Sequence, residues 1–185
     1  MKKTMLSLAL TLGCVLALGT PAAAQNKKPQ PYSTQPKLVP AKIKQGEADV
    51  FEVRGKASFT VTSANTDDTI NGTITYTLPE EARKKLAELS GKKPAEIPAT
   101  LTRPEVVAAF QKATACPVVH LEFNPMDFDV AGQRVHFSRL VLDVPDGPDE
   151  VAKHICVWTK QINGGRSRRG VIASLNRYIN GETNN

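Results

Sequence analysis

The stretch Cys116–Val144, CPVVHLEFNPMDFDVAGQRVHFSRLVLDV, has the pattern of a long β-hairpin that turns at Ala131-Gly132-Gln133. Apolar and polar residues alternate along both arms, which is the period of a half-buried strand. The apolar set changes parity once on each arm, at Asn124-Pro125 and at Ser138-Arg139. Because a shift of one residue inverts the faces of a strand, these matched changes predict a bulge or bend on each arm. The sequence therefore predicts a curved hairpin.

The segments on either side predict further strands and helices. Alternation over 51–62 and 69–78 indicates two strands joined by a turn, and Pro79 begins a helix that ends at Gly91. A second helix is expected over 102–115, where Thr102 and Glu105 have the spacing of a capping box. Two more helices follow the hairpin, over 149–163 and 171–180, and Trp158 is expected to anchor the first of them in the core.

This order of elements, ββααββαα, predicts an α+β fold. Its simplest arrangement is a four-stranded antiparallel sheet with the helices packed on one face. Residues 47–181 are expected to form this single globular domain, and residues 182–185 a frayed tail.

The first 24 residues have the form of a bacterial secretory signal peptide. Lys2 and Lys3 precede an apolar run, which ends at the small-residue cleavage site Ala22-Ala23-Ala24. The mature chain is expected to begin near Gln25 and to be periplasmic or secreted. Loss of Lys2 and Lys3 would lower the formal net charge from +6 to +4. No later stretch is long and apolar enough to span a bilayer.

Residues 25–46 are expected to be a disordered arm rich in lysine and proline. The arm has no acidic residue before Glu47, and proline together with self-repelling charge favours an extended chain. Two interpretations are open. The arm is either a solvated spacer or a basic tether for an anionic surface.

Cys116 and Cys156 are the two cysteines outside the leader, and an exported chain favours a disulfide between them. A zinc site is not favoured, because neither residue has a second cysteine at the CxxC spacing. No cofactor is expected.

Enzyme motifs such as GxSxG, HExxH and phosphate-binding loops are absent from the sequence. One polar constellation, Asp127, Asp129 and His136, is expected on one face of the hairpin, with Asp129 opposite His136. Two carboxylates and an imidazole can bind a divalent metal or act as an acid–base pair. The same residues can also be a cross-strand charge pair that contributes little. His120, Glu122 and Asp143 form a second such face.

Arg166, Arg168 and Arg169 crowd the break between the last two expected helices. Guanidinium groups bind phosphate or carboxylate in a forked geometry, so the cluster is a candidate anion site. The alternative is a solvated basic loop. Nucleic acid is not expected as a partner, because the leader directs the chain out of the cytoplasm.

These observations favour an exported, non-catalytic binding domain for an amphiphilic or anionic ligand of the cell envelope. An apolar ligand could lie between the sheet and its helices. Two alternatives remain open: a metal-dependent hydrolase centred on Asp127, Asp129 and His136, and a protein that binds a partner within a cell-envelope complex.

Overall fold

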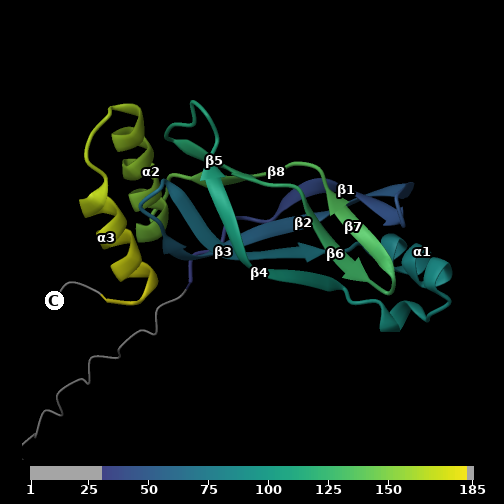
Figure 1. Ribbon diagram of the computed structural model, residues 1–185. Helices are drawn as coiled ribbons and strands as arrows, with labels where there is room; N and C mark the ends of the chain where they lie inside the picture. Colours follow the sequence, from purple (N-terminus) through teal and green to yellow (C-terminus); the bar gives the residue numbers. More distant parts are fainter. Residues whose placement is uncertain (1–30, 183–185) are drawn as a thin grey trace, which may run out of the picture.

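A computed structural model describes residues 31–182, which form a curled antiparallel sheet with helices at its two ends (Figure 1). Within these residues the sheet has eight strands, in the order β6-β7-β1-β2-β3-β4-β5-β8. The prediction of a four-stranded sheet with helices on one face is therefore wrong. The strands are β1 (Lys37–Gln45), β2 (Ala48–Ala64), β3 (Thr69–Thr77), β4 (Thr100–Phe110), β5 (Val118–Phe123), β6 (Met126–Val130), β7 (Gln133–Phe137) and β8 (Leu140–Pro145). The helices are α1 (Glu80–Ser90), α2 (Glu150–Asn163) and α3 (Arg169–Ile179), with a short 3-10 turn at Pro94–Glu96.

The curved hairpin is confirmed, and it explains why the sheet curls. Its arms break at Asn124-Pro125 and Ser138-Arg139, so that each arm consists of two strands. At the base of the hairpin β5 pairs with both β8 and β4, whereas at its tip β7 pairs with both β6 and β1. Strands β1 to β4 form a meander whose outer strands are β1 and β4. The single hairpin therefore pairs with both edges of this meander.

Residues 102–115 do not form the expected helix. Residues 100–110 are strand β4, which pairs with β3 along most of its length and with β5 near its end. The ladder shifts register at Pro104-Glu105, where Glu105 has a φ of 55°. Leu101, Val106 and Ala108 are buried, but the bulge shifts the buried positions by one residue between Leu101 and Val106. The period of two that marks a strand is therefore not visible in the sequence of this segment. The Thr102/Glu105 spacing was therefore misleading.

The prediction that residues 25–46 are a disordered arm is wrong for Lys37–Gln45. These residues form β1 between β2 and β7. Val39, Ala41 and Ile43 point into the core, with exposed fractions of 6%, 3% and 0%. Pro40 lies where β1 is no longer paired with β7, a position that does not need its missing N–H. The high lysine content masked a regular alternation.

The core is filled by aromatic and aliphatic side chains from the inner side of the sheet. Phe59, Tyr76, Phe123 and Phe137 are fully or almost fully buried, and their rings contact one another edge to face in two pairs. Gly72 is needed for this packing, because a Cβ atom there would overlap the Thr60 carbonyl and the Phe59 ring. The fold thus keeps a glycine where an aromatic ring covers the neighbouring strand.

The helices lie at opposite ends of the sheet (Figure 1). Helix α1 ends at Gly91 as predicted, and Asp149 begins α2 by accepting hydrogen bonds from the backbone N–H groups of Val151 and Ala152. Trp158 of α2 is fully buried, which confirms it as a core anchor. The expected leader, residues 1–24, and residues 183–185 of the expected tail lie outside the described residues.

Candidate functional site

A hollow lined by basic residues lies where α2 passes into α3. Its lining comes from the β2–β3 turn, the α2–α3 loop and the start of α3, and its volume is about 490 Å³. The lining residues are Thr66, Gly165, Arg166, Ser167, Arg168, Arg169 and Ile172. All three arginines singled out in the sequence therefore surround one hollow, and none of the lining residues is acidic.

The backbone of the α2–α3 loop is held by hydrogen bonds to the end of α2. Gly164 N–H donates to the Lys160 carbonyl over 3.0 Å, and Arg166 N–H donates to the Gln161 carbonyl over 2.9 Å. Gly165 has a φ of 61°, the left-handed conformation that glycine adopts most readily. The two glycines thereby turn the chain sharply and bring the arginines to one end of the molecule.

Arg168 is oriented by an acidic residue far away in the sequence. Its Nη1 atom lies 2.7 Å from Oδ2 of Asp68, in the β2–β3 turn. The other carboxylate oxygen of Asp68 accepts a hydrogen bond of 3.1 Å from the indole nitrogen of Trp158. Asp68 thus connects the arginine hollow to the anchor of the core. The sequence offered no signal for this contact, because it joins residues about 100 positions apart.

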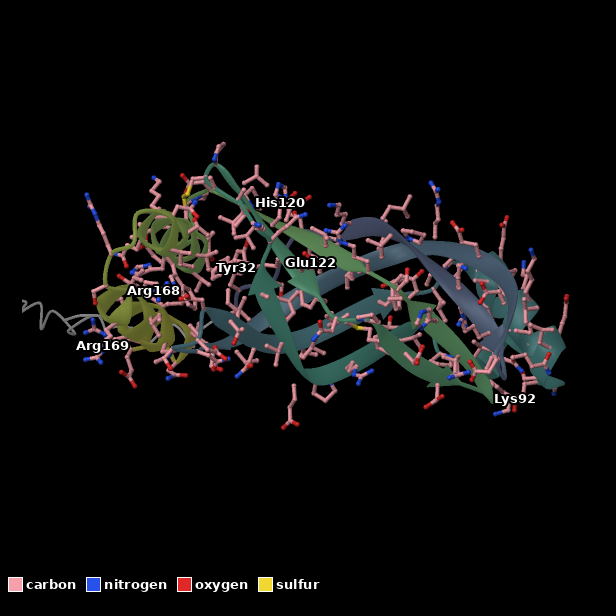
Figure 2. The ribbon with its side chains drawn as sticks, turned by 45° about the horizontal axis from the view of Figure 1, so that its top comes forward. Tyr32, Lys92, His120, Glu122, Arg168 and Arg169 are labelled. Atoms are coloured by element: carbon pink, nitrogen blue, oxygen red, sulfur yellow. A yellow bond between two sulfur atoms is a disulfide. The ribbon has the colours of Figure 1, made fainter. Side chains whose placement is uncertain are left out.

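Arg166 and Arg169 differ from Arg168 in their surroundings. Both are exposed, and neither forms an ion pair or side-chain hydrogen bond with another of the described residues 31–182. Figure 2 shows Arg168 and Arg169 beside α2 and α3, at the end of the molecule opposite Lys92. The N–H donors of Arg166 and Arg169 are therefore available to an anion.

The three candidate metal ligands do not converge on one point. Nδ1 of His136 lies 2.7 Å from Oδ1 of Asp127, but Asp129 is opposite Arg134. The expectation that Asp129 faces His136 is wrong by two residues, because the turn consists of Ala131 and Gly132. Within residues 31–182 no group of three or more His, Cys, Asp or Glu residues is placed to hold a metal ion.

A second histidine–aspartate pair lies on the base of the hairpin, where His120 and Glu122 project from β5 (Figure 2). Nδ1 of His120 lies 2.7 Å from Oδ1 of Asp143, and Lys37 Nζ lies 2.8 Å from Oδ2 of the same carboxylate. Lys37 belongs to β1, so this ion pair joins β1 to β8 across strands that do not pair. Partial burial raises the pKa of Asp143, but the hydrogen bonds from Lys37 and His120 outweigh it and leave the pKa below its ordinary value.

The lowered pKa of Asp143 predicts a stability contribution that depends on pH. A carboxyl group whose pKa is lower in the folded chain stabilises it above the unfolded pKa, near 3.8, and loses this effect as the pH falls toward the folded pKa. Asp143→Asn should therefore cost up to about 1 kcal/mol at pH 7, since the pair is partly exposed and screened. The cost should vanish near pH 2.

Urea unfolding at both pH values measures this difference. Asp129→Asn is a matched control, because Asp129 is exposed and has no ion pair in the described residues. A cost for Asp143→Asn that is the same at both pH values would contradict the assignment.

Cys116 and Cys156 are joined by a disulfide, as the sequence predicts. Their Cα atoms lie 5.6 Å apart, and the bond connects the segment before β5 to α2. A disulfide of this kind fits an extracellular or periplasmic protein. Among the helices of residues 31–182, none has the length and apolar character needed to cross a membrane.

Comparison with models of protein families, with curated proteins and with solved structures finds no match to this chain.

Proposed function

We propose that the protein is an exported, non-catalytic binding domain whose ligand is an anionic component of the cell envelope. The observation that carries this proposal is the hollow lined by Arg166, Arg168 and Arg169 without any acidic lining residue. Guanidinium groups present several N–H donors in a plane, which suits the oxygens of phosphate and carboxylate groups.

The three arginines have different roles in the proposed site. Arg168 is already bound to Asp68, so it supplies a fixed wall and part of the positive potential. Arg166 and Arg169 are the groups that donate to the ligand, since they have no competing carboxylate among the described residues. Ser167 and Thr66 line the same hollow and add hydroxyl donors.

We favour an anionic ligand bound at the surface over an apolar ligand held inside the curled sheet. The inner side of the sheet is packed with buried aromatic rings, including Phe59, Tyr76, Phe123 and Phe137. An amphiphilic ligand is therefore expected to bind through its charged headgroup, at the surface. Export is supported by the disulfide and by the signal-peptide pattern of residues 1–24.

Isothermal titration with inorganic phosphate tests the proposal. The double substitution Arg166→Gln/Arg169→Gln should weaken phosphate binding at least about tenfold, because a hydrogen bond to a charged group contributes roughly 1.5–3 kcal/mol. Arg54→Gln is the matched control, since Arg54 is an exposed arginine on β2, with 70% of its side chain accessible. It should leave the affinity unchanged.

A second titration identifies the source of the anion. Vesicles containing phosphatidylglycerol should bind more tightly than free phosphate if the ligand is a lipid headgroup, and no more tightly if it is a soluble anion. The proposal is wrong if phosphate and vesicles both fail to bind, or if Arg54→Gln weakens binding as much as the double substitution.

A further inference from the structure

Strands β4 and β6 face each other across a gap without pairing. Strand β6 is at one end of the sheet order, and β4 pairs with β5 only over residues 108–110. The first half of β4 and the outer edge of β6 therefore have no strand neighbour on this side within residues 31–182. A hollow of about 500 Å³ separates them, lined by residues 100–104 and 127–129.

The register determines which backbone groups face the gap. In an antiparallel ladder, hydrogen-bonded pairs alternate with pairs whose N–H and C=O groups point away from the partner strand. Val130 and Gln133 flank the two-residue turn and form a hydrogen-bonded pair, so the backbone groups of Asp127 and Asp129 point outward. Leu78 N–H donates to the Ala99 carbonyl over 2.9 Å, which directs the groups of the next β4 residues, Thr100 and Thr102, into the same gap.

A side chain joins the two edges where a backbone ladder would otherwise be. Arg103 of β4 donates from Nη1 to the Asp127 carbonyl of β6 over 3.0 Å. Arg103 is exposed, and its long side chain can leave the gap without disturbing the core. The outer edge of β6 is thus a row of backbone donors and acceptors of which one acceptor is covered by a movable side chain.

The charges along β6 indicate what kind of strand fits. Asp127 and Asp129 project from the same face of β6, and Asp129 is exposed. A second copy that paired through its own β6 would bring these carboxylates close to their equivalents, and like charges on adjacent strands are destabilising. A strand with lysine or arginine at alternate positions would instead place opposite charges beside them.

We propose that β6 binds an extended, basic segment of a protein partner by strand addition. The segment pairs with the outward backbone groups of Asp127 and Asp129, displaces Arg103 from the Asp127 carbonyl, and sets its basic side chains beside the two carboxylates. Backbone pairing supplies the affinity in this mode of recognition, and alternate side chains supply the specificity. This surface is separate from the arginine hollow.

The test uses the full-length chain and an eight-residue fluorescent peptide of alternating lysine and threonine. A matched peptide with glutamate in place of lysine should bind at least about tenfold more weakly. The net positive charge of the protein opposes this preference, so a preference for the lysine peptide would come from the local carboxylates. Substitutions in the arginine hollow should not change it.

Backbone pairing is tested with methylated peptides. Methylation of the amide nitrogens at every second residue removes the donors on one edge of the peptide strand. One of the two alternate methylation patterns should weaken binding at least about tenfold, and the other should change it by less than about twofold. Binding should also slow hydrogen exchange at the amides of Asp127 and Asp129.

Charge reversal supplies the matched variants. Asp129→Lys should abolish the preference for the lysine peptide, because it replaces one of the two carboxylates by a cation and leaves the other in place. Glu88→Lys, on the exposed side of α1, should leave the preference unchanged.

Three results would overturn the proposal. The first is equal binding of the lysine and glutamate peptides, or equal effects of the two methylation patterns. The second is a dimer that protects the Asp127 and Asp129 amides, because a second copy would then cover the edge. The third is protection that disappears when residues 25–30 are deleted, which would make the chain's own basic segment the occupant.

Discussion

Replacing both Cys116 and Cys156 by serine is expected to lower the free energy of unfolding by about 4 kcal/mol. The bond closes a loop of 40 residues, and restricting such a loop in the unfolded chain accounts for this amount on the chain-entropy model. For a chain of this size the melting temperature should fall by about 8–16 °C. Urea unfolding followed by the fluorescence of Trp158, the single tryptophan, measures the change.

The control for the disulfide prediction is the native chain unfolded in the presence of a reductant. It should lose the same stability as the double serine variant, because both lack the cross-link. A loss below about 1 kcal/mol in both cases would show that the bond contributes little to the stability of the domain.

Trp158→Ala is expected to destabilise the fold by about 3–5 kcal/mol. Trp158 is fully buried, its ring contacts Phe110 edge to face at 4.9 Å, and its indole nitrogen donates to Asp68. The substitution removes a large buried surface and leaves a cavity between α2 and the sheet. Thermal and urea unfolding followed by far-UV circular dichroism measure the loss.

Trp158→Phe separates packing from the hydrogen bond. It keeps most of the ring volume but removes the donor to Asp68, so it should cost only about 1–2 kcal/mol. Because Asp68 also holds Arg168, phosphate binding at the arginine hollow should weaken in Trp158→Phe while the fold persists. Equal losses of stability in the two variants would contradict the packing argument.

The hairpin was predictable because its evidence is local. The alternation of residues 116–144, the parity changes at Asn124-Pro125 and Ser138-Arg139, and a turn containing Gly132 all lie within one continuous segment. The same holds for α1 and α2, whose limits are marked by Gly91 and Asp149. In each case the residues that determine the local structure are close together in the chain.

The two misassigned segments show where local evidence is insufficient. The spacing of Thr102 and Glu105 fits the start of a helix, but β3 and β5 both need a hydrogen-bonding neighbour, and β4 supplies it. In β1 the lysines suggested a solvated arm, although Val39, Ala41 and Ile43 alternate toward the core. Pairing with neighbouring strands and burial of one face outweighed the local sequence signals in both segments.

The candidate sites also differ in how much of each could be predicted from local sequence. The arginine cluster was visible in the sequence because Arg166, Arg168 and Arg169 are almost consecutive. Two other features depend on the tertiary structure and could not be inferred from the sequence. They are the ion pair between Asp68 and Arg168 and the gap between β4 and β6. The expected pairing of Asp129 with His136 was wrong because it depended on the exact position of a two-residue turn, and Asp127 takes that place instead.

The sequence by itself determined the curved hairpin, the helix limits at Gly91 and Asp149, and the arginine cluster, because each follows from the chemistry of neighbouring residues. It also determined the disulfide partners, because only two cysteines lie outside the expected leader. Only the tertiary structure decided the eight-strand order and the unpaired edges of β4 and β6. Every residue except proline carries the same backbone N–H and C=O groups, so which strand edges meet depends on how the whole chain buries its apolar faces.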